Sequence, residues 1–244
     1  MELSFHREWK KKRKKRLQPD NENYPINIHE RGFYKFKRKE TMGKMITGSE
    51  ILKRVKEGTI QITDFDMKRL NPNSYNLRIG DKIGYYPMNE YCEYAYSDFE
   101  RKHPIYYLDT MRKNTMEYVP IPEDGLVITP GLLYLANTME TVTCGDLIPS
   151  LSGRSSMARL GVEIHRTAGF GDIGASMKWT LEITVIHPVK IYPGQELCQI
   201  YFEVPQGDTD IKYIGKYQYA DGIVPSKSYL DAVKEFGKSQ YDLD

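Results

Sequence analysis

The sequence predicts an all-β domain, a sandwich or a barrel with one short helix near its N-terminal end. Between residues 126 and 204 the chain is a succession of short apolar runs separated by Gly and Pro, as at Pro130-Gly131 and Pro193-Gly194. Few helical periods lie between these runs, whereas a parallel α/β sheet needs a helix between most of its strands. A body of about 200 residues with this pattern can bury roughly 70% of its unfolded surface, which is enough for an independent core.

The first predicted element is a helix over residues 49–57. Ile51 and Val55 fall on one face of it, Ser49 is placed to cap its start, and Gly58 is placed to end it. The sequence therefore predicts one short helix packed on the β domain by a single apolar face.

Strands are expected along the rest of the domain. Turn residues at 71–74 precede an alternating run that ends at Gly80, and residues 82–86 form the next expected strand. The later strands are expected at 126–128, 133–136, 162–164, 180–185, 189–192 and 197–204. Residues 87–118 hold six tyrosines among many charges, which predicts a hairpin packed on the domain by its Tyr rings, with an aromatic binding surface as the alternative.

Charge divides the chain into two parts. Residues 1–44 contain 14 Lys and Arg against 6 Asp and Glu, so they carry a net charge of +8 within a formal total of only +2. The run from Lys10 to Arg16 is entirely basic, and because like charges repel we expect residues 1–44 to be a poorly ordered extension. The extension could bind nucleic acid, but a solvated tail is the favoured interpretation, since basic runs match such motifs by chance.

Composition excludes several classes of protein. The mean hydropathy is −0.59 and no run of about 18 apolar residues exists, so we expect a cytoplasmic protein with no contact to a membrane. Cys92, Cys144 and Cys198 are isolated along the chain. Their spacing argues against a disulfide framework and against a thiolate zinc site, because no Cys-x-x-Cys pair occurs.

The first candidate site is the segment from Ser152 to Gly161. It contains a pair of hydroxyl residues and two arginines around one possible helical turn: Arg154, Ser155, Ser156 and Arg159. Free backbone N–H groups, hydroxyls and guanidinium groups can converge there on an anion such as a phosphate chain. Each residue alone has a plainer interpretation as a helix cap or a surface charge, but the two arginines flanking two serines favour a site.

The second candidate site centres on Glu182. In the expected strand 180–185, a period of two sends Leu181 and Ile183 to one face and Thr180 and Glu182 to the other. Glu182 then faces a polar side, where a carboxylate could hold and deprotonate a water molecule. The pattern alone favours an ordinary exposed strand glutamate.

Several motifs in fixed order resemble the dCTP deaminase family of the trimeric dUTPase superfamily. The central ones are Gly153–Val162, His165-x-Thr-Ala168, Asp172-x-Gly174 and Thr180–Ile183. Others are Asn71–Arg78, Pro130-Gly131, Pro193-Gly194, Gln199 and Gly215–Tyr217. The resemblance covers residues 45–228, which leaves 1–44 as an extension and 229–244 as a C-terminal tail.

The resemblance implies a distorted jelly-roll or β-barrel of the dUTPase-like type, assembled as a homotrimer with active sites between subunits. The residues implied to bind the triphosphate, with Mg²⁺ held mainly by phosphate oxygens and water, are Arg154, Ser155, Ser156, Arg159, Tyr213, Lys216 and Gln218. Those implied to bind the base and the deoxyribose are His165, Thr167, Ala168, Asp172 and Thr180. Binding of dTTP as an inhibitor is also consistent with the family.

The resemblance assigns catalysis to Glu182. The Pro-Cys-x-x-Cys motif of zinc deaminases is missing from the sequence, so the resemblance implies that a carboxylate activates water for attack at C4 of cytosine. We expect dCTP to yield dUTP and ammonia without zinc. The alternative is a bifunctional enzyme that gives dUMP and pyrophosphate, and a lower-ranked one is a regulatory module that binds nucleotide without turnover.

Two stretches depart from the family pattern. After Asp172 the family has Pro, Gly and an aromatic residue, where this chain has Ile173, Gly174 and Ala175. The family's Gln downstream of the Lys-Tyr pair is replaced by Tyr219 and Ala220. Trp179 could supply the missing aromatic volume, and Gln218 could supply the missing amide.

Overall fold

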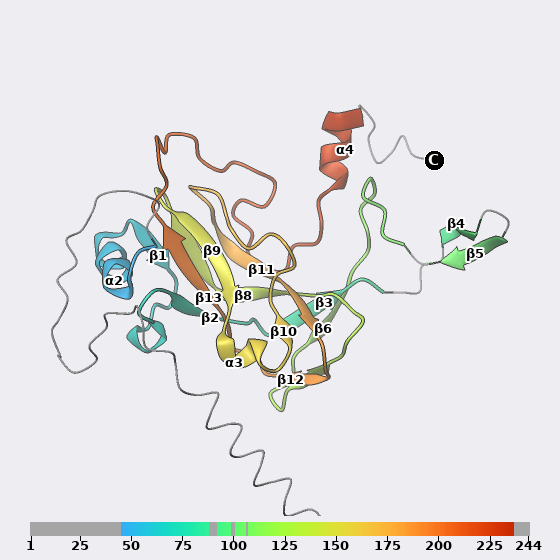
Figure 1. The fold of residues 1–244 in the computed structure, drawn as a ribbon, viewed down its shortest axis with the longest axis horizontal. Helices are drawn as coiled ribbons and strands as arrows, with labels where there is room; N and C mark the ends of the chain where they lie inside the picture. The colour runs from blue at the N-terminus through green and yellow to red at the C-terminus, as the bar shows by residue number, and fades with distance from the viewer. Residues whose placement is uncertain (1–44, 88–91, 99–100, 106, 237–244) are drawn as a thin grey trace, which may run out of the picture. The chain divides into compact units, whose positions relative to one another are not determined.

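The computed structural model describes residues 45–87, 92–98, 101–105 and 107–236. The basic extension predicted over residues 1–44 lies outside this part of the chain, and its boundary stays a prediction. The helices are α2 (Gly48–Glu57), the short 3-10 helix η1 (Met67–Arg69), α3 (Ser155–Ala158) and α4 (Tyr229–Phe236). All other named elements are strands, which confirms the predicted all-β class (Figure 1).

The larger sheet has six strands in the order β10 (Val162–Glu163), β11 (Ser176–Val185), β8 (Tyr134–Cys144), β3 (Lys82–Tyr85) and β6 (Glu117–Pro120), with β1 (Ile60–Ile62) also paired to β8. A three-stranded sheet runs β2 (Tyr75–Arg78), β13 (Glu196–Glu203) and β9 (Ile148–Gly153). Two smaller pairs join β7 (Leu126–Ile128) to β12 (Val189–Ile191) and β4 (Cys92–Asp98) to β5 (Arg101–Ile105).

Side chains of the two larger sheets form one apolar core. Leu77, Ile200 and Phe202 from the three-stranded sheet belong to the same buried cluster as Leu181 and Ile183 from the six-stranded sheet. The described strands pair in antiparallel fashion and form no closed barrel, so the arrangement is that of a sandwich. Cys144 and Cys198 are free, fully buried thiols within it.

A buried ion pair joins the two larger sheets. Glu140 of β8 is fully buried and accepts hydrogen bonds from Arg78 of β2, at 2.7 Å from the guanidinium Nε and 2.9 Å from the backbone N–H. Arg69 lies 3.7 Å from the same carboxylate. Two cations and a backbone donor therefore compensate the cost of burying this charge.

Two local predictions need correction. The helix begins at Gly48 with Thr47 at the N-cap, and Ser49 bonds the Thr47 hydroxyl at 2.9 Å instead of capping a backbone N–H. Gly58 does end the helix, in the left-handed conformation at φ 76°. The strand expected at 133–136 runs instead from Tyr134 to Cys144, because polar residues that are buried continue it beyond residue 136.

The Tyr-rich stretch contains the predicted hairpin, formed by β4 and β5. The side chains of these two strands lie outside the described part of the chain, so their packing stays a prediction. Tyr107 and Tyr118, which flank the hairpin, are exposed.

Candidate active site

Glu182 lies near the end of β11, on the strand face that the period-two pattern predicted. Leu181 and Ile183 are fully buried in the core, whereas Thr180, Glu182 and Thr184 alternate with them and are partly exposed. β8 lies on one side of Glu182, opposite Leu135, and on the other side the Glu182 N–H donates to the Ile164 carbonyl at 3.0 Å. The backbone of Glu182 is therefore hydrogen-bonded on both sides, which fixes the position from which its side chain extends.

A backbone donor holds the Glu182 carboxylate. The N–H of Arg166 donates to Glu182 Oε2 at 3.0 Å. The Arg166 side chain is fixed in turn, because its Nη1 bonds the Glu163 carboxylate at 2.9 Å and the Thr184 hydroxyl at 3.3 Å. The Thr184 hydroxyl also donates to Glu163 at 2.8 Å. We call Glu163, Arg166 and Thr184 the Arg166 clasp, and it ties the loop after β10 to β11.

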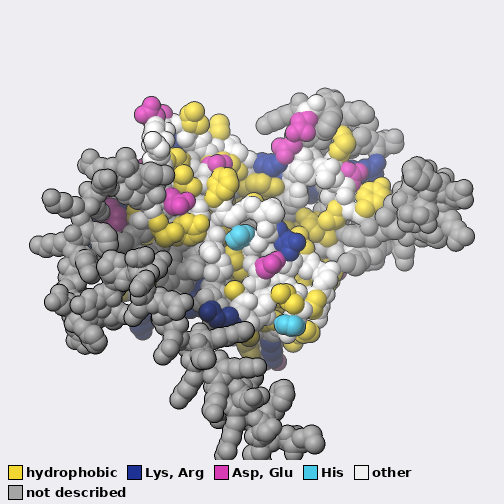
Figure 2. Space-filling model, viewed as in Figure 1, with side chains coloured by type: hydrophobic (Ala, Val, Ile, Leu, Met, Phe, Trp, Pro, Cys, Tyr) yellow, Lys and Arg dark blue, Asp and Glu magenta, His cyan; other side chains and the backbone are white. Residues whose placement is uncertain are grey.

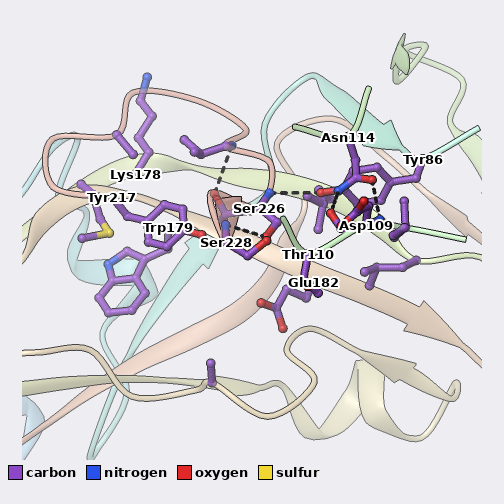
Figure 3. Close-up of a pocket in the computed structure, with 18 residues that line it drawn as sticks. Tyr86, Asp109, Thr110, Asn114, Lys178, Trp179, Glu182, Tyr217, Ser226 and Ser228 are labelled. Atoms are coloured by element: carbon purple, nitrogen blue, oxygen red, sulfur yellow. Dashed lines mark hydrogen bonds between the residues drawn. The ribbon is translucent and has the colours of Figure 1, made fainter. Parts of the chain in front are cut away.

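The cavity beside Glu182 has a volume of about 450 Å³. Figure 3 shows Glu182 between Trp179 on one side and a group of Asp109, Asn114 and Tyr86 on the other, in the view drawn. The lining of this cavity comes from β8 and β11, the residues next to β3 and β8, the loop between β10 and β11, the segment after β5, and residues 217–228. The lining residues are Tyr86, Leu108, Asp109, Thr110, Asn114, Leu133, Leu135, Ala168, Met177, Lys178, Trp179, Thr180, Glu182, Tyr217, Ala220, Val224, Ser226 and Ser228.

Residues 217–228, which we call the C-terminal segment, are hydrogen-bonded over this cavity. Val224 N–H donates to the Thr180 hydroxyl at 3.3 Å, and Ser226 N–H donates to the Tyr86 hydroxyl at 3.1 Å. Burial raises the pKa of Tyr86, so its phenol stays neutral under ordinary conditions. Lys178 pairs with Asp221 at 2.5 Å and lowers the pKa of that carboxyl group. These contacts give the cavity a roof made from the same chain.

Residues 109–114 form a self-bonded turn at the edge of the cavity. The Asn114 amide accepts from Asp109 N–H at 3.0 Å and donates to the Asp109 carbonyl at 2.8 Å. The Asp109 carboxylate accepts from Met111 N–H at 2.8 Å. The turn is therefore fixed by its own polar groups before any ligand binds.

The predicted phosphate segment lies elsewhere. Ser155 and Ser156 begin α3, and with Arg159 they are exposed and line no part of the Glu182 cavity. Arg159 Nη1 donates to the Ser155 carbonyl at 2.9 Å, while Arg154 is partly buried against Glu196. Within one chain, the structure does not bring Arg154–Arg159 and Glu182 into the same cavity.

The residues predicted to bind base and sugar are divided among several places. Ala168 and Thr180 line the Glu182 cavity, and Thr167 is exposed. His165 has a buried Nδ1 without a hydrogen-bond partner among the described residues. Asp172 lines a second cavity of about 450 Å³ together with Tyr213.

Exposed apolar side chains border the second cavity. Phe170, Ile211 and Ile214 line it and are 70%, 91% and 92% exposed. Exposed apolar side chains are also visible on the face drawn in Figure 2. Side chains this apolar and this exposed are typical of a surface that another chain covers.

Lys216 and Gln218, predicted to close over the triphosphate, contact protein in this structure. The Lys216 ammonium pairs with Asp231 of α4. The Gln218 amide accepts from Ser176 N–H at 3.0 Å and donates to the Gly174 carbonyl at 2.9 Å. Gln218 therefore anchors the C-terminal segment to the start of β11.

Comparison with known families decides where this arrangement belongs. The model of the family described as dCTP deaminase-like matches residues 45–204. The chain belongs to the dCTP deaminase-like family. Curated relatives named "dCTP deaminase, dUMP-forming" are similar over almost their whole length. The one from Leptospira biflexa is 42% identical over 191 residues, which are 78% of this chain and 99% of the relative. The one from Clostridium beijerinckii is 43% identical over 190 residues, again 78% and 99%.

The names of these dCTP deaminase relatives favour the alternative product over the one expected first, since they specify dUMP where the sequence led us to expect dUTP. The crystal structure of 2′-deoxycytidine 5′-triphosphate deaminase from Agrobacterium tumefaciens aligns with a TM-score of 0.47 at 21% identity, over 67% of this chain and 48% of that one. A likeness this weak adds nothing to the family assignment.

Sequence reasoning missed much of the lining and support of the Glu182 cavity. The turn at 109–114, Tyr86 and the Arg166 clasp carried no recognisable motif.

Among the described residues no group of three or more His, Cys, Asp or Glu side chains could hold a metal ion. In the same part of the chain, no helix is long and apolar enough to cross a membrane.

Proposed function

We propose that this chain deaminates dCTP and then hydrolyses the nucleotide to dUMP and pyrophosphate. One observation carries the deaminase assignment: Glu182 presents a carboxylate, oriented by the Arg166 N–H, to a cavity with mainly apolar walls. Leu133, Leu135 and Trp179 among those walls offer surfaces against which a pyrimidine ring can pack. The names of the relatives support the second, phosphate-cleaving step.

Glu182 acts as general base and then as general acid. Its carboxylate takes a proton from water, and the resulting hydroxide adds to C4 of cytosine. The same group delivers that proton to N3 of the ring and then carries the proton of the added hydroxyl to the amino group, so that ammonia leaves as the C4 carbonyl forms. The Arg166 N–H donates to Oε2 of Glu182. The other carboxylate oxygen, Oε1, has no hydrogen bond to the described residues, so it can hold the water.

The triphosphate binds the segment Arg154–Arg159. Two hydroxyls, two guanidinium groups and the N–H groups at the start of α3 are donors that suit phosphate oxygens. This donor set contains no carboxylate that would serve as a Mg²⁺ ligand, and it fits a Mg²⁺ carried on the phosphate oxygens and water. When bound, Mg²⁺ neutralises part of the triphosphate charge. Asp172 is an exposed carboxylate in the second cavity and is the candidate to orient the water that attacks phosphorus.

The complete site forms between subunits of a homotrimer. Two observations support this: Arg154–Arg159 lie outside the Glu182 cavity, and the exposed side chains Phe170, Ile211 and Ile214 form an apolar surface beside Asp172. A phosphate segment from one copy would then serve the Glu182 cavity of another.

Product analysis tests the reaction. The chain is incubated with dCTP and Mg²⁺, and ammonia, pyrophosphate, dUTP and dUMP are followed together. We expect ammonia and pyrophosphate in equal amounts with little dUTP. Ammonia with accumulating dUTP would show a deaminase alone, and nucleotide binding without any product would show a regulatory module. Glu203→Gln is the matched control for Glu182→Gln, because the Glu203 carboxylate on β13 makes no hydrogen bond or ion pair with the described residues.

Subunit mixing tests the location of the site. Alone, Glu182→Gln should be inactive, and Arg154→Ala should keep weak activity with a raised KM. If each site combines Glu182 of one copy with Arg154 of another, co-assembled mixtures of the two variants regain part of the wild-type rate. No recovery in mixtures that light scattering shows to be trimeric would place both residues in the same subunit's site.

A further inference from the structure

Glu196 holds the guanidinium of Arg154 on the side that faces the protein. The Arg154 Nη1 donates to the Glu196 carbonyl at 2.8 Å and lies 3.3 Å from the Glu196 carboxylate Oε2. Both side chains are 32% exposed. The other nitrogens of the guanidinium, Nε and Nη2, make no hydrogen bond to the described residues. A guanidinium has five N–H donors in a rigid fork, so fixing Nη1 orients the remaining donors.

The Glu196 carboxylate is itself fixed by a buried amide. Its Oε2 accepts from the Asn76 side chain at 2.8 Å, and Asn76 Oδ1 accepts from the Asn71 amide at 2.7 Å. The Asn71 amide also donates to the Ser74 hydroxyl at 3.1 Å. Asn76 and Ser74 are both buried. Glu196 is therefore part of a polar network rather than a mobile surface group.

The network returns to the residue before Arg154. The Ser74 hydroxyl donates to Gln199 Oε1 at 2.6 Å, and Gln199 Nε2 donates to the Gly153 carbonyl at 2.9 Å. One set of side chains thus holds the guanidinium of Arg154 and also the peptide group immediately before it. The motif Asn71–Arg78 contains Asn71, Ser74 and Asn76. The proposed deamination mechanism assigns no role to these residues.

We propose that Glu196 and Asn76 are positioning residues for Arg154 in triphosphate binding, an inference that rests on the proposed function. The network fixes the guanidinium before the nucleotide arrives, so less conformational freedom is lost on binding. Asn76 keeps the Glu196 carboxylate in place, and Glu196 keeps Nη1 turned inward. A purely structural network would instead join β2, β9 and β13 without affecting phosphate affinity.

Steady-state kinetics with dCTP give the first test. Glu196→Ala is expected to raise KM about tenfold, with the change on KM rather than kcat, because one charge-assisted contact to Arg154 is lost. Glu196→Gln should recover most of the affinity, since an amide oxygen can still accept from Asn76 and Arg154. Glu203→Ala on the same strand is the control. A KM for Glu196→Ala equal to that of the control overturns the proposal.

A double-mutant cycle separates positioning from folding. In an Arg154→Ala background, Glu196→Ala should change KM by less than about twofold, because its target is already missing. An undiminished effect there would show that Glu196 acts by another route. Calorimetry with inorganic tripolyphosphate gives the same comparison without turnover, with binding about tenfold weaker in Glu196→Ala than in wild type. Absence of ammonia from the wild-type protein would refute the deaminase proposal, while the tripolyphosphate comparison would still decide the positioning role.

Discussion

The Glu182 cavity and the Arg154–Arg159 segment differ in how completely one chain builds them. The cavity has a floor from β11, a side wall from residues 108–114 and a roof from the C-terminal segment, each fixed by hydrogen bonds. The phosphate segment has a fixed inner side at Arg154 but presents Ser155, Ser156 and Arg159 on an exposed surface.

The proposed function accounts for this difference, because it assigns the cytosine ring to the cavity and the triphosphate to the segment. A pyrimidine is planar and largely apolar, so a preformed apolar cavity suits it and excludes bulk water from the reacting carbon. A triphosphate is charged and strongly hydrated, and its donors must stay accessible until it arrives. We therefore expect substitutions around the cavity to affect both stability and rate, and substitutions of the exposed donors to affect mainly affinity.

The largest expected effect is that of Glu182→Gln. An amide cannot accept a proton from water, so ammonia release should fall by about 10²- to 10⁴-fold. Nucleotide affinity should change little, because the amide is nearly the same size. Ammonia assays and equilibrium dCTP binding measure the two quantities. Ammonia release near the wild-type rate would remove Glu182 from the mechanism and leave the cavity without a base.

Gly171→Ala should displace a wall of the Glu182 cavity, although residue 171 does not line that cavity itself. A Cβ at residue 171 would lie 2.3 Å from the Trp179 ring, so the indole that lines the cavity would have to move. We expect a loss of about 1–3 kcal/mol in the free energy of unfolding, with a lower kcat. Gly145→Ala is the control, because nothing lies within 4 Å of its added Cβ. Equal denaturation midpoints for the two variants would contradict a tightly packed wall.

Tyr86→Phe should loosen the roof. It removes the acceptor for Ser226 N–H, a contact that contributes about 0.5–1.5 kcal/mol. Hydrogen exchange at Ser226 should accelerate, and it should not do so in Tyr118→Phe, whose ring is exposed.

The wild-type roof should also respond to alkaline pH. Since burial raises the pKa of Tyr86, its stabilising effect is complete below the unfolded value of about 10 and is lost as pH rises through the higher folded value. A protection factor for the Ser226 N–H that stays constant across that range, once the base-catalysed rise in intrinsic exchange is divided out, would show that Tyr86 does not hold the roof.

The smallest expected effect on stability is that of Arg159→Ala. The side chain is exposed and, among the described residues, bonds only a carbonyl in its own helical turn, so the free energy of unfolding should change by less than about 0.5 kcal/mol. KM for dCTP should nevertheless rise several-fold if the segment binds phosphate. A large loss of stability with an unchanged KM would reverse the proposed contrast between the two halves.

Local patterns predicted the parts of the fold that depend on local physics. Alternation on β11 placed Glu182 on the correct face, and Gly58 ended its helix as expected. The full length of β8 was not predicted, because Glu140 is a charge in a buried strand. Its partner Arg78 is 62 residues away in sequence, and that pairing leaves no local signal.

The candidate site was predictable from sequence where its residues are neighbours along the chain. Arg154, Ser155, Ser156 and Arg159 formed a visible cluster, although the sequence could not tell that only Arg154 is anchored. Tyr86 and Ser226 meet across 140 residues, so neither indicated a roof over the cavity. Contacts of this kind depend on how the sheets stack, which periodicity does not encode.

The two buried cysteines offer a way to time the opening of each sheet separately. Cys144 lies on β8 of the six-stranded sheet and Cys198 on β13 of the three-stranded sheet, and burial raises the pKa of both thiols. Only the thiolate reacts with alkylating reagents. Labelling at each position should therefore wait until its own strand is released, so in a Cys92→Ser background the two labelling rates would show whether the sheets come apart together or in sequence.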